Sequence, residues 1–133
     1  MATLKGMLGM TRNLATAKKK GRDWETACAE WFTRKLRLPV ERRRLTGIED
    51  RGDLAGLPSL VVECKNVQAW DATGWLAECA VETRNQARHA SDPNTLGIVM
   101  RRTKGKPAVE DSIVLMTPAT FLELYQAYLD WLH

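Results

Sequence analysis

One stretch constrains the fold more than any other, because it reads as a strand with two different faces. In the segment 59–65, SLVVECK, successive side chains of an extended chain point to opposite sides. Glu63 and Lys65 therefore share one face, while Val62 and Cys64 share the other. The first apolar residues of the segment fill both faces, which is typical of a strand inside a sheet. We predict a central strand with one apolar face and one face that carries an acid and a base.

A second acid is predicted to lie beside this strand. The turn 50–53 ends in Asp53, and the connection Gly56-Leu57-Pro58 then leads into the strand. Such a hairpin folds Asp53 back alongside Glu63. Two carboxylates are hard oxygen ligands of the kind that Mg²⁺ prefers, with Mn²⁺ as a substitute. The backbone carbonyl of Cys64 is a further predicted ligand.

This set of groups is suited to metal-assisted hydrolysis of a phosphodiester. The metal ion polarises the scissile phosphate and lowers the pKa of a bound water. Lys65 can orient that water and neutralise the negative charge that develops in the transition state. Asp50, in the same turn, is an alternative to Asp53 as the first acid.

The distribution of charge points to a polyanionic partner. Residues 1–44 contain twelve Lys or Arg against four acids, although the whole chain has a net charge of only +4, so the remainder is acidic. Such a polarised chain is typical of nucleic-acid binding, and the alternative is a solvated basic surface with no partner. The loop 101–106 is also basic. The predicted DNA contacts are Lys18, Lys19, Lys20, Arg22, Arg42, Arg43, Arg44 and Arg84.

A chain of 133 residues is expected to form one domain, which we divide into a basic N-terminal arm (1–22) and a nuclease domain (23–133). The arm is expected to be mobile or loosely helical. The predicted order is helix, three strands, helix, two strands, helix, which indicates an α/β fold with a central mixed sheet flanked by helices. The predicted helices cover 23–38, 75–90 and 118 onwards, and the strands cover 40–45, 54–55, 59–65, 95–102 and 112–117.

Asp23 is the expected N-cap of the first helix, which has core residues such as Trp24 and Trp31 at helical spacing. In the second helix, the inner face is predicted to hold Cys79 and Thr83. The outer face is predicted to hold Glu78, Glu82, Arg84, Arg88 and His89.

The three cysteines and the apolar runs bear on the compartment. Cys28, Cys64 and Cys79 form no CxxC pair and are expected to be reduced thiols in the core, too few for an iron–sulfur cluster. No apolar run approaches the roughly 20 residues that span a bilayer, and no cleavable signal pattern is present. We therefore expect a cytoplasmic protein that does not associate with membranes.

The chain resembles the PD-(D/E)xK nuclease superfamily, through Gly52-Asp53-Leu54 followed by Val61-Val62-Glu63-Cys64-Lys65. It is most similar to the archaeal-type Holliday junction resolvases, which have a K-G-x-x-x-E helix start, here residues 20–25, and a Ser/Thr-Gly turn before the aspartate, here Thr46-Gly47. The recognisable motifs cover about residues 18–90. The chain departs from the family pattern at Thr26, where an arginine often follows the helix glutamate.

The resemblance implies a restriction-endonuclease-like core and a structure-selective DNA endonuclease that acts on four-way junctions as a homodimer. It implies that Asp53, Glu63 and Lys65 are catalytic, with Glu25 as a further acid near the metal. It also implies a supporting role for Gln86, whose alternative is a buried helix residue hydrogen-bonded to the backbone.

Two other functions remain open on the sequence. One is a nuclease of RecB-like type that acts on flaps or single-strand ends, and the other is a catalytically inert DNA-binding module. Trp70, in the loop after the central strand, could contact DNA or a second subunit. The final helix has too many apolar residues for one stripe and could provide an isologous contact between two copies.

Overall fold

The computed structural model describes residues 4–44 and 49–133, with side chains from residue 14 onwards. Within these residues the predicted order of helices and strands is confirmed, with one short 3-10 turn added before the last strand. The turn at Thr46-Gly47 lies outside the described residues. The elements are α1 (Leu4–Leu36), β1 (Glu41–Arg42), β2 (Leu54–Ala55), β3 (Leu60–Lys65), α2 (Ala72–Ala90), β4 (Leu96–Arg101), η1 (Val109–Asp111), β5 (Ile113–Leu115) and α3 (Pro118–Leu132).

The strands form two small sheets instead of one central sheet. β1 and β2 pair antiparallel, and a separate mixed sheet has the order β3-β4-β5, with β3 parallel and β5 antiparallel to β4. In the parallel pair, Leu60 lies opposite Leu96 and Lys65 lies opposite Arg101. β2 is too short to continue along β3, because the chain turns at Gly52 and again at Gly56, both with positive φ. The α/β class with a mixed sheet is thus confirmed, and β1 and β2 form a separate small sheet beside it.

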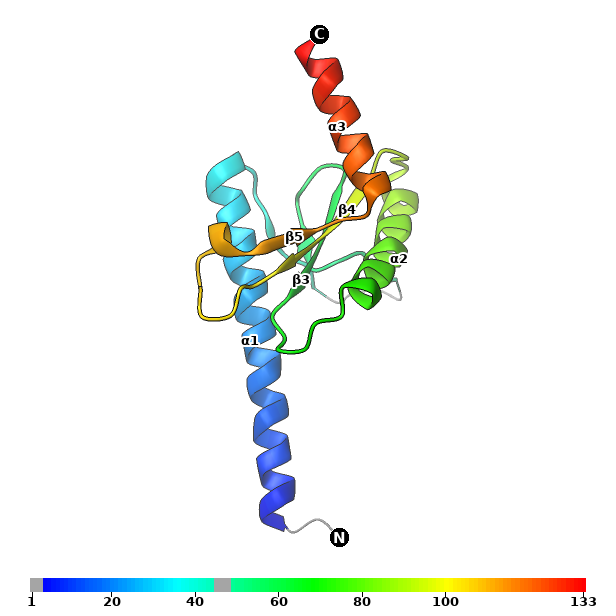
Figure 1. Ribbon diagram of the computed structural model, residues 1–133. Coiled ribbons are helices and arrows are strands. Elements are labelled where there is room, and N and C mark those ends of the chain that lie inside the picture. Colours follow the sequence, from blue (N-terminus) through cyan, green and yellow to red (C-terminus); the bar gives the residue numbers. More distant parts are fainter. Residues whose placement is uncertain (1–3, 45–48) are drawn as a thin grey trace.

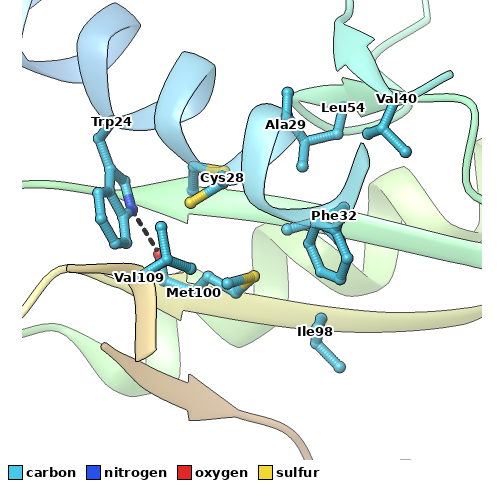
Figure 2. Packing of buried hydrophobic residues seen from close by; sticks show 11 residues of the cluster. Trp24, Cys28, Ala29, Phe32, Val40, Leu54, Ile98, Met100 and Val109 are labelled. Carbon is cyan, nitrogen blue, oxygen red and sulfur yellow. Dashed lines mark hydrogen bonds between the residues drawn. The ribbon is translucent and has the colours of Figure 1, made fainter. Parts of the chain in front are cut away.

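The core lies between α1 and one face of the three-stranded sheet. Trp24, Cys28 and Phe32 project from successive turns of α1 toward the sheet (Figure 2). The Trp24 indole nitrogen donates to the Met100 backbone oxygen at 3.1 Å, which ties α1 to β4. Val62 belongs to the same cluster, as its alternation in β3 predicted. All three cysteines of the chain are buried free thiols, which confirms that prediction.

Helix α1 begins at Leu4, so the prediction that the helix starts at Asp23 is wrong. Asp23 lies inside the helix, where its carboxylate pairs with Lys19 four residues earlier at 2.9 Å. Residues 14–20 are all exposed, so this part of α1 has no apolar stripe from which a helix could be predicted. It is nevertheless rich in Ala and Lys, which are strong helix formers. The N-terminal half of α1 extends beyond the sheet (Figure 1).

Helix α2 covers the opposite face of the sheet from α1 (Figure 1). Its N-cap is Asp71, which accepts a hydrogen bond from the Gly74 backbone nitrogen at 3.1 Å. Trp75 and Cys79 pack with Val99 of β4 in a second, smaller cluster. The sheet therefore lies between two helices, and β3 presents one face to each.

Helix α3 extends away from the sheet (Figure 1), and none of its residues is buried. Its exposed residues include Phe121, Tyr125, Tyr128 and Trp131, the last of which is 78% exposed. Among residues 4–44 and 49–133, no helix combines the length and the apolar content that a membrane span requires.

Candidate active site

Asp53 is held against β3 by a turn that requires glycine. Gly52 has φ of 92°, and a side chain there would place a Cβ 2.7 Å from Val61 Cγ1. The Asp53 backbone nitrogen donates to the Val62 oxygen at 3.0 Å, and its carboxylate accepts from the Cys64 backbone nitrogen at 2.7 Å. The prediction that the hairpin folds Asp53 alongside the central strand is confirmed.

Glu63 and Lys65 lie on the face of β3 that points toward α2, as the alternation predicted. Glu63 is buried, and its Oε1 lies 3.4 Å from Lys65 Nζ. Lys65 is half-buried and makes a shorter ion pair, 2.8 Å long, with Glu78 of α2. The ammonium group of Lys65 is thus held by the carboxylates of both Glu63 and Glu78.

Helix α2 adds a buried carboxyl group that we had placed on its outer face. Glu82 is only 4% exposed, so its predicted outward position is wrong. Carboxylate oxygens of Glu63, Glu78 and Glu82 all lie within 4.8 Å of one another. Glu78 is exposed, as predicted for the outer face, and its carboxylate turns toward Lys65.

The position of Glu82 leaves a signal in the sequence that we did not use. Trp75, Cys79, Glu82 and Gln86 follow one another at spacings of four, three and four residues, which places them on one helical face. An acid in such a stripe is unusual, since charged groups are rarely buried unless they have partners. The shared helical face of Glu82, Trp75 and Cys79 is therefore the signal that identifies Glu82 as a site residue.

Burial and mutual repulsion raise the pKa values of three carboxyl groups in the site. Burial, followed by the charge of Glu63, raises the pKa of Asp53 to about 8. Burial and the adjacent carboxyl group of Glu82 raise the pKa of Glu63 to about 9, and burial raises the pKa of Glu82 to about 7. Burial acts to lower the pKa of Lys65, but its contacts with Glu78 and Glu63 raise it overall, so the lysine stays charged.

These groups fit a hard divalent cation. Oε2 of Glu63 and Oε2 of Glu82 are both buried and have no hydrogen-bond partner among the residues that the structure describes. A buried carboxylate oxygen without a partner is unfavourable by several kcal/mol unless the group is neutral or bound to a cation. The donors are all oxygen atoms, as Mg²⁺ and Mn²⁺ require.

Glu25, the acid predicted from the first helix, lies close enough to Asp53 to raise the pKa of that carboxyl group. Its own carboxylate is paired with the guanidinium of Arg42 at 2.8 Å. Arg43 also has a partner within the chain, since its guanidinium donates to the Leu54 backbone oxygen at 3.2 Å. Arg42 and Arg43, both predicted to contact DNA, therefore make contacts within the protein. The other predicted DNA contacts, Lys18, Lys19, Lys20, Arg22, Arg44 and Arg84, are exposed.

The loop before Asp53 is fixed from α2. Asn85 is buried and donates to the Asp50 backbone oxygen at 2.7 Å, while the Asp50 carboxylate accepts from the Gly52 nitrogen at 3.1 Å. Asp50 is exposed and lies near Glu82, where it contributes to the raised pKa of that group. The structure thus brings both candidate aspartates to the site, Asp53 next to Glu63 and Asp50 next to Glu82. Gln86 Oε1 is buried without a hydrogen-bond partner in the described part of the chain.

Taken together, the site gathers buried carboxylate oxygen atoms beside a charged lysine. Such a set of donors is of the kind that a hard divalent cation takes. No family model matches the chain, and neither curated proteins nor solved structures provide a match to it.

Proposed function

We propose that this protein is a metal-dependent, structure-selective DNA endonuclease that hydrolyses phosphodiester bonds in branched DNA, in the manner of a Holliday junction resolvase. One observation supports the proposal above all others. Asp53, Glu63 and Lys65 form only a weak pattern in the sequence, but in the structure Asp53 lies at the edge of β3 beside Glu63, whose neighbour on the strand face is Lys65. Among the described residues, Glu63 Oε2 is buried without a hydrogen-bond partner.

Mg²⁺, or Mn²⁺ in its place, would be held by Asp53, Glu63 and Glu82, with the Cys64 carbonyl as a further donor, and would supply Lewis-acid polarisation of the phosphate. Lys65 remains protonated and is fixed by two glutamates, so it acts as a positioned positive charge that neutralises the pentavalent phosphate. Glu78 is the positioning residue for Lys65. Glu25 and Arg42 form an ion pair that links α1 to β1 at the edge of the site.

The DNA would be held by four exposed cations of α1, Lys18, Lys19, Lys20 and Arg22, together with Arg44 and Arg84. Binding through phosphates releases counterions, so affinity is expected to fall steeply with salt. Symmetric cutting of a four-way junction needs two active sites, and the exposed apolar residues of α3 supply a surface through which two copies would pair.

The proposal is tested by incubating the purified protein with four-way, flap and linear DNA in Mg²⁺, Mn²⁺ or EDTA. We expect cleavage of the four-way junction that requires the metal. Glu63→Gln and Lys65→Ala should each lower the rate at least 100-fold, because they remove a metal ligand and a transition-state charge.

Glu30→Gln is the matched control for this experiment, since Glu30 is an exposed acid of α1 away from the site. It should cleave at the wild-type rate. Undiminished cleavage by Glu63→Gln would reject the proposed site. DNA binding without cleavage in either metal would instead identify an inert binding module, and preference for flaps would indicate the RecB-like alternative.

A further inference from the structure

A groove of about 920 Å³ lies between α1 and the loops that follow β3 and β4. Its walls include Lys20 of α1, Asn66 and Val67 of the first loop, and Arg102 and Lys104 of the second. A hollow of this size is at the upper end of what small-molecule sites occupy, and it is open along one side. It does not include Asp53, Glu63 or Lys65.

The groove begins where the candidate active site ends. β3 and β4 run parallel, so both finish at the same edge of the sheet. Asn66 follows Lys65 directly and donates to the Lys20 backbone oxygen at 3.4 Å, and the Arg102 backbone nitrogen donates to the Lys65 oxygen at 2.9 Å. A polymer that lies in the groove would therefore pass next to the end of the catalytic strand.

Positive charge dominates the groove. Lys20, Arg101, Arg102 and Lys104 contribute to its walls. Asp23 is the one acid among the described lining residues, and its carboxylate is already paired with Lys19. The groove therefore favours an anion with several charges spread along it.

The floor of the groove and its rim also provide apolar surface. Small apolar groups, Ala17, Ala27, Val67 and Pro107, line it between the cations. At the rim, the Arg101 guanidinium lies over the ring of Trp70, 5.1 Å from its centroid, and donates to the Val67 backbone oxygen at 3.2 Å. Trp70 is nevertheless 53% exposed, and its indole is fixed edge-on to Trp75 at 5.3 Å. Trp70 lies next to the groove through Arg101 without lining it, and because Arg101 covers one ring face, a nucleobase would stack on the part of the indole that remains exposed.

We propose that this groove binds a single-stranded segment of DNA, with phosphates on Lys20, Arg102 and Lys104 and a base on Trp70. A duplex would place only phosphates on the rim and would leave the apolar floor uncovered, since its bases are stacked inside. An unpaired strand uses both surfaces. The inference extends the proposed nuclease function, on which it rests for the identity of the polymer, by specifying that the strand next to the cut is unpaired when it is bound, which in a four-way junction requires base pairs at the branch point to open.

The test measures binding separately from catalysis. Fluorescence anisotropy of a labelled 12-nucleotide oligothymidylate is recorded with EDTA present, and a hairpin duplex of the same length serves as the comparison. We expect tighter binding to the single strand. The variant Arg102→Ala/Lys104→Ala should weaken that binding at least tenfold and reduce the slope of log K against log salt by about 1.4, because two phosphate contacts are lost. Trp70→Ala should weaken it about fivefold or more.

Arg34→Ala/Lys35→Ala is the matched control, because it removes two exposed cations of α1 that do not line the groove. It should bind the oligothymidylate within twofold of wild type, and circular dichroism should confirm that all variants are folded. Equal binding by the groove variant and the control, or a groove variant that loses duplex and single-strand binding alike, would overturn the inference. Metal-dependent cleavage is measured in parallel. If wild type cleaves and the groove variant binds normally, only the groove is rejected. If wild type binds as expected but does not cleave, only the nuclease function is rejected.

Discussion

At the scale of single residues, the site is a set of acids that repel one another. Glu63 and Glu82 are buried and Asp53 is half-buried, and the neighbouring carboxyl groups make ionisation of each less favourable. A cation reverses this situation, because it favours the ionised form of every ligand. The same carboxyl groups that destabilise the metal-free protein are thus the ones that would give it affinity for a metal.

This arrangement predicts how the metal-free protein responds to pH. The carboxyl groups of Asp53, Glu63 and Glu82 have pKa values of about 8, 9 and 7 in the folded protein, well above the values of 3.8, 4.5 and 4.5 of unperturbed groups. Between these limits the folded state binds more protons than the unfolded state, so the free energy of unfolding falls as pH rises. In EDTA, the Tm measured by circular dichroism should be highest near pH 5 and several degrees lower at pH 9.

Glu82→Gln removes one of the groups that must ionise, so its Tm should decline less between pH 5 and pH 9 than that of wild type. Glu30→Gln, on an exposed part of α1, should follow the wild-type curve. If the wild-type Tm rose between pH 5 and pH 9, burial of these acids would not be the dominant influence on the pH dependence of stability.

At the scale of elements, the site depends on a short hairpin and on two helices that cover opposite faces of β3. Much of this could be predicted, because the hairpin is bounded by Gly52, Gly56 and Pro58 and because alternation along β3 separates Val62 from Glu63. A search for apolar residues alone placed Glu82 on the outer face of α2, whereas its helical register with Trp75 and Cys79 is the signal that marks it as buried. The division into two sheets depends on where β2 stops, which is decided by contacts distant in sequence.

The sequence pattern also did not predict that α1 extends back to Leu4. This extent of the helix leads to a prediction about Gly21. This residue lies inside α1, and a Cβ added there would meet no atom within 4 Å. Glycine in a helix interior is less favourable than alanine by about 0.5–1 kcal/mol, so Gly21→Ala should stabilise the protein and raise its Tm by a few degrees. Thermal denaturation followed at 222 nm measures the change.

Gly97→Ala is the opposite control, because a Cβ at that position in β4 would lie 2.8 Å from Cys79 Sγ and still closer to Thr83 Oγ1. It should lower the Tm. If Gly21→Ala left the Tm unchanged or lowered it, the helix would not be continuous through the basic segment in solution.

At the scale of the whole molecule, α3 is the element with least support from the rest of the chain. Phe121, Tyr125, Tyr128 and Trp131 follow one another along it, with ring centroids 6.0 to 6.5 Å apart. An exposed aromatic row of this kind is typical of a surface that is covered by a partner. In the proposed function that partner is a second copy of the chain.

Sedimentation equilibrium should accordingly give a mass twice that of one chain. Tyr125→Glu should shift the mass to that of a monomer, because it would bury a charge at the centre of the contact. Gln126→Glu introduces the same side chain next to it, at an exposed position whose amide donates to Asp130, and should remain dimeric. A monomeric wild type would reject α3 as a dimer contact.

The position of Asp53 has a consequence for the integrity of the sheet. In the described three-stranded sheet, β3 is one of the two outer strands, and no full strand among the described residues pairs with its free side. Asp53 covers part of that side with two hydrogen bonds, one from its backbone to Val62 and one from Cys64 to its carboxylate. An apolar strand with an open edge invites edge-to-edge association. Asp53, which is proposed to bind the metal, therefore also protects this edge of β3 from pairing with another chain. Asp53→Asn keeps a carbonyl acceptor for the Cys64 hydrogen bond, so it tests the metal role with less disturbance of the edge than Asp53→Ala.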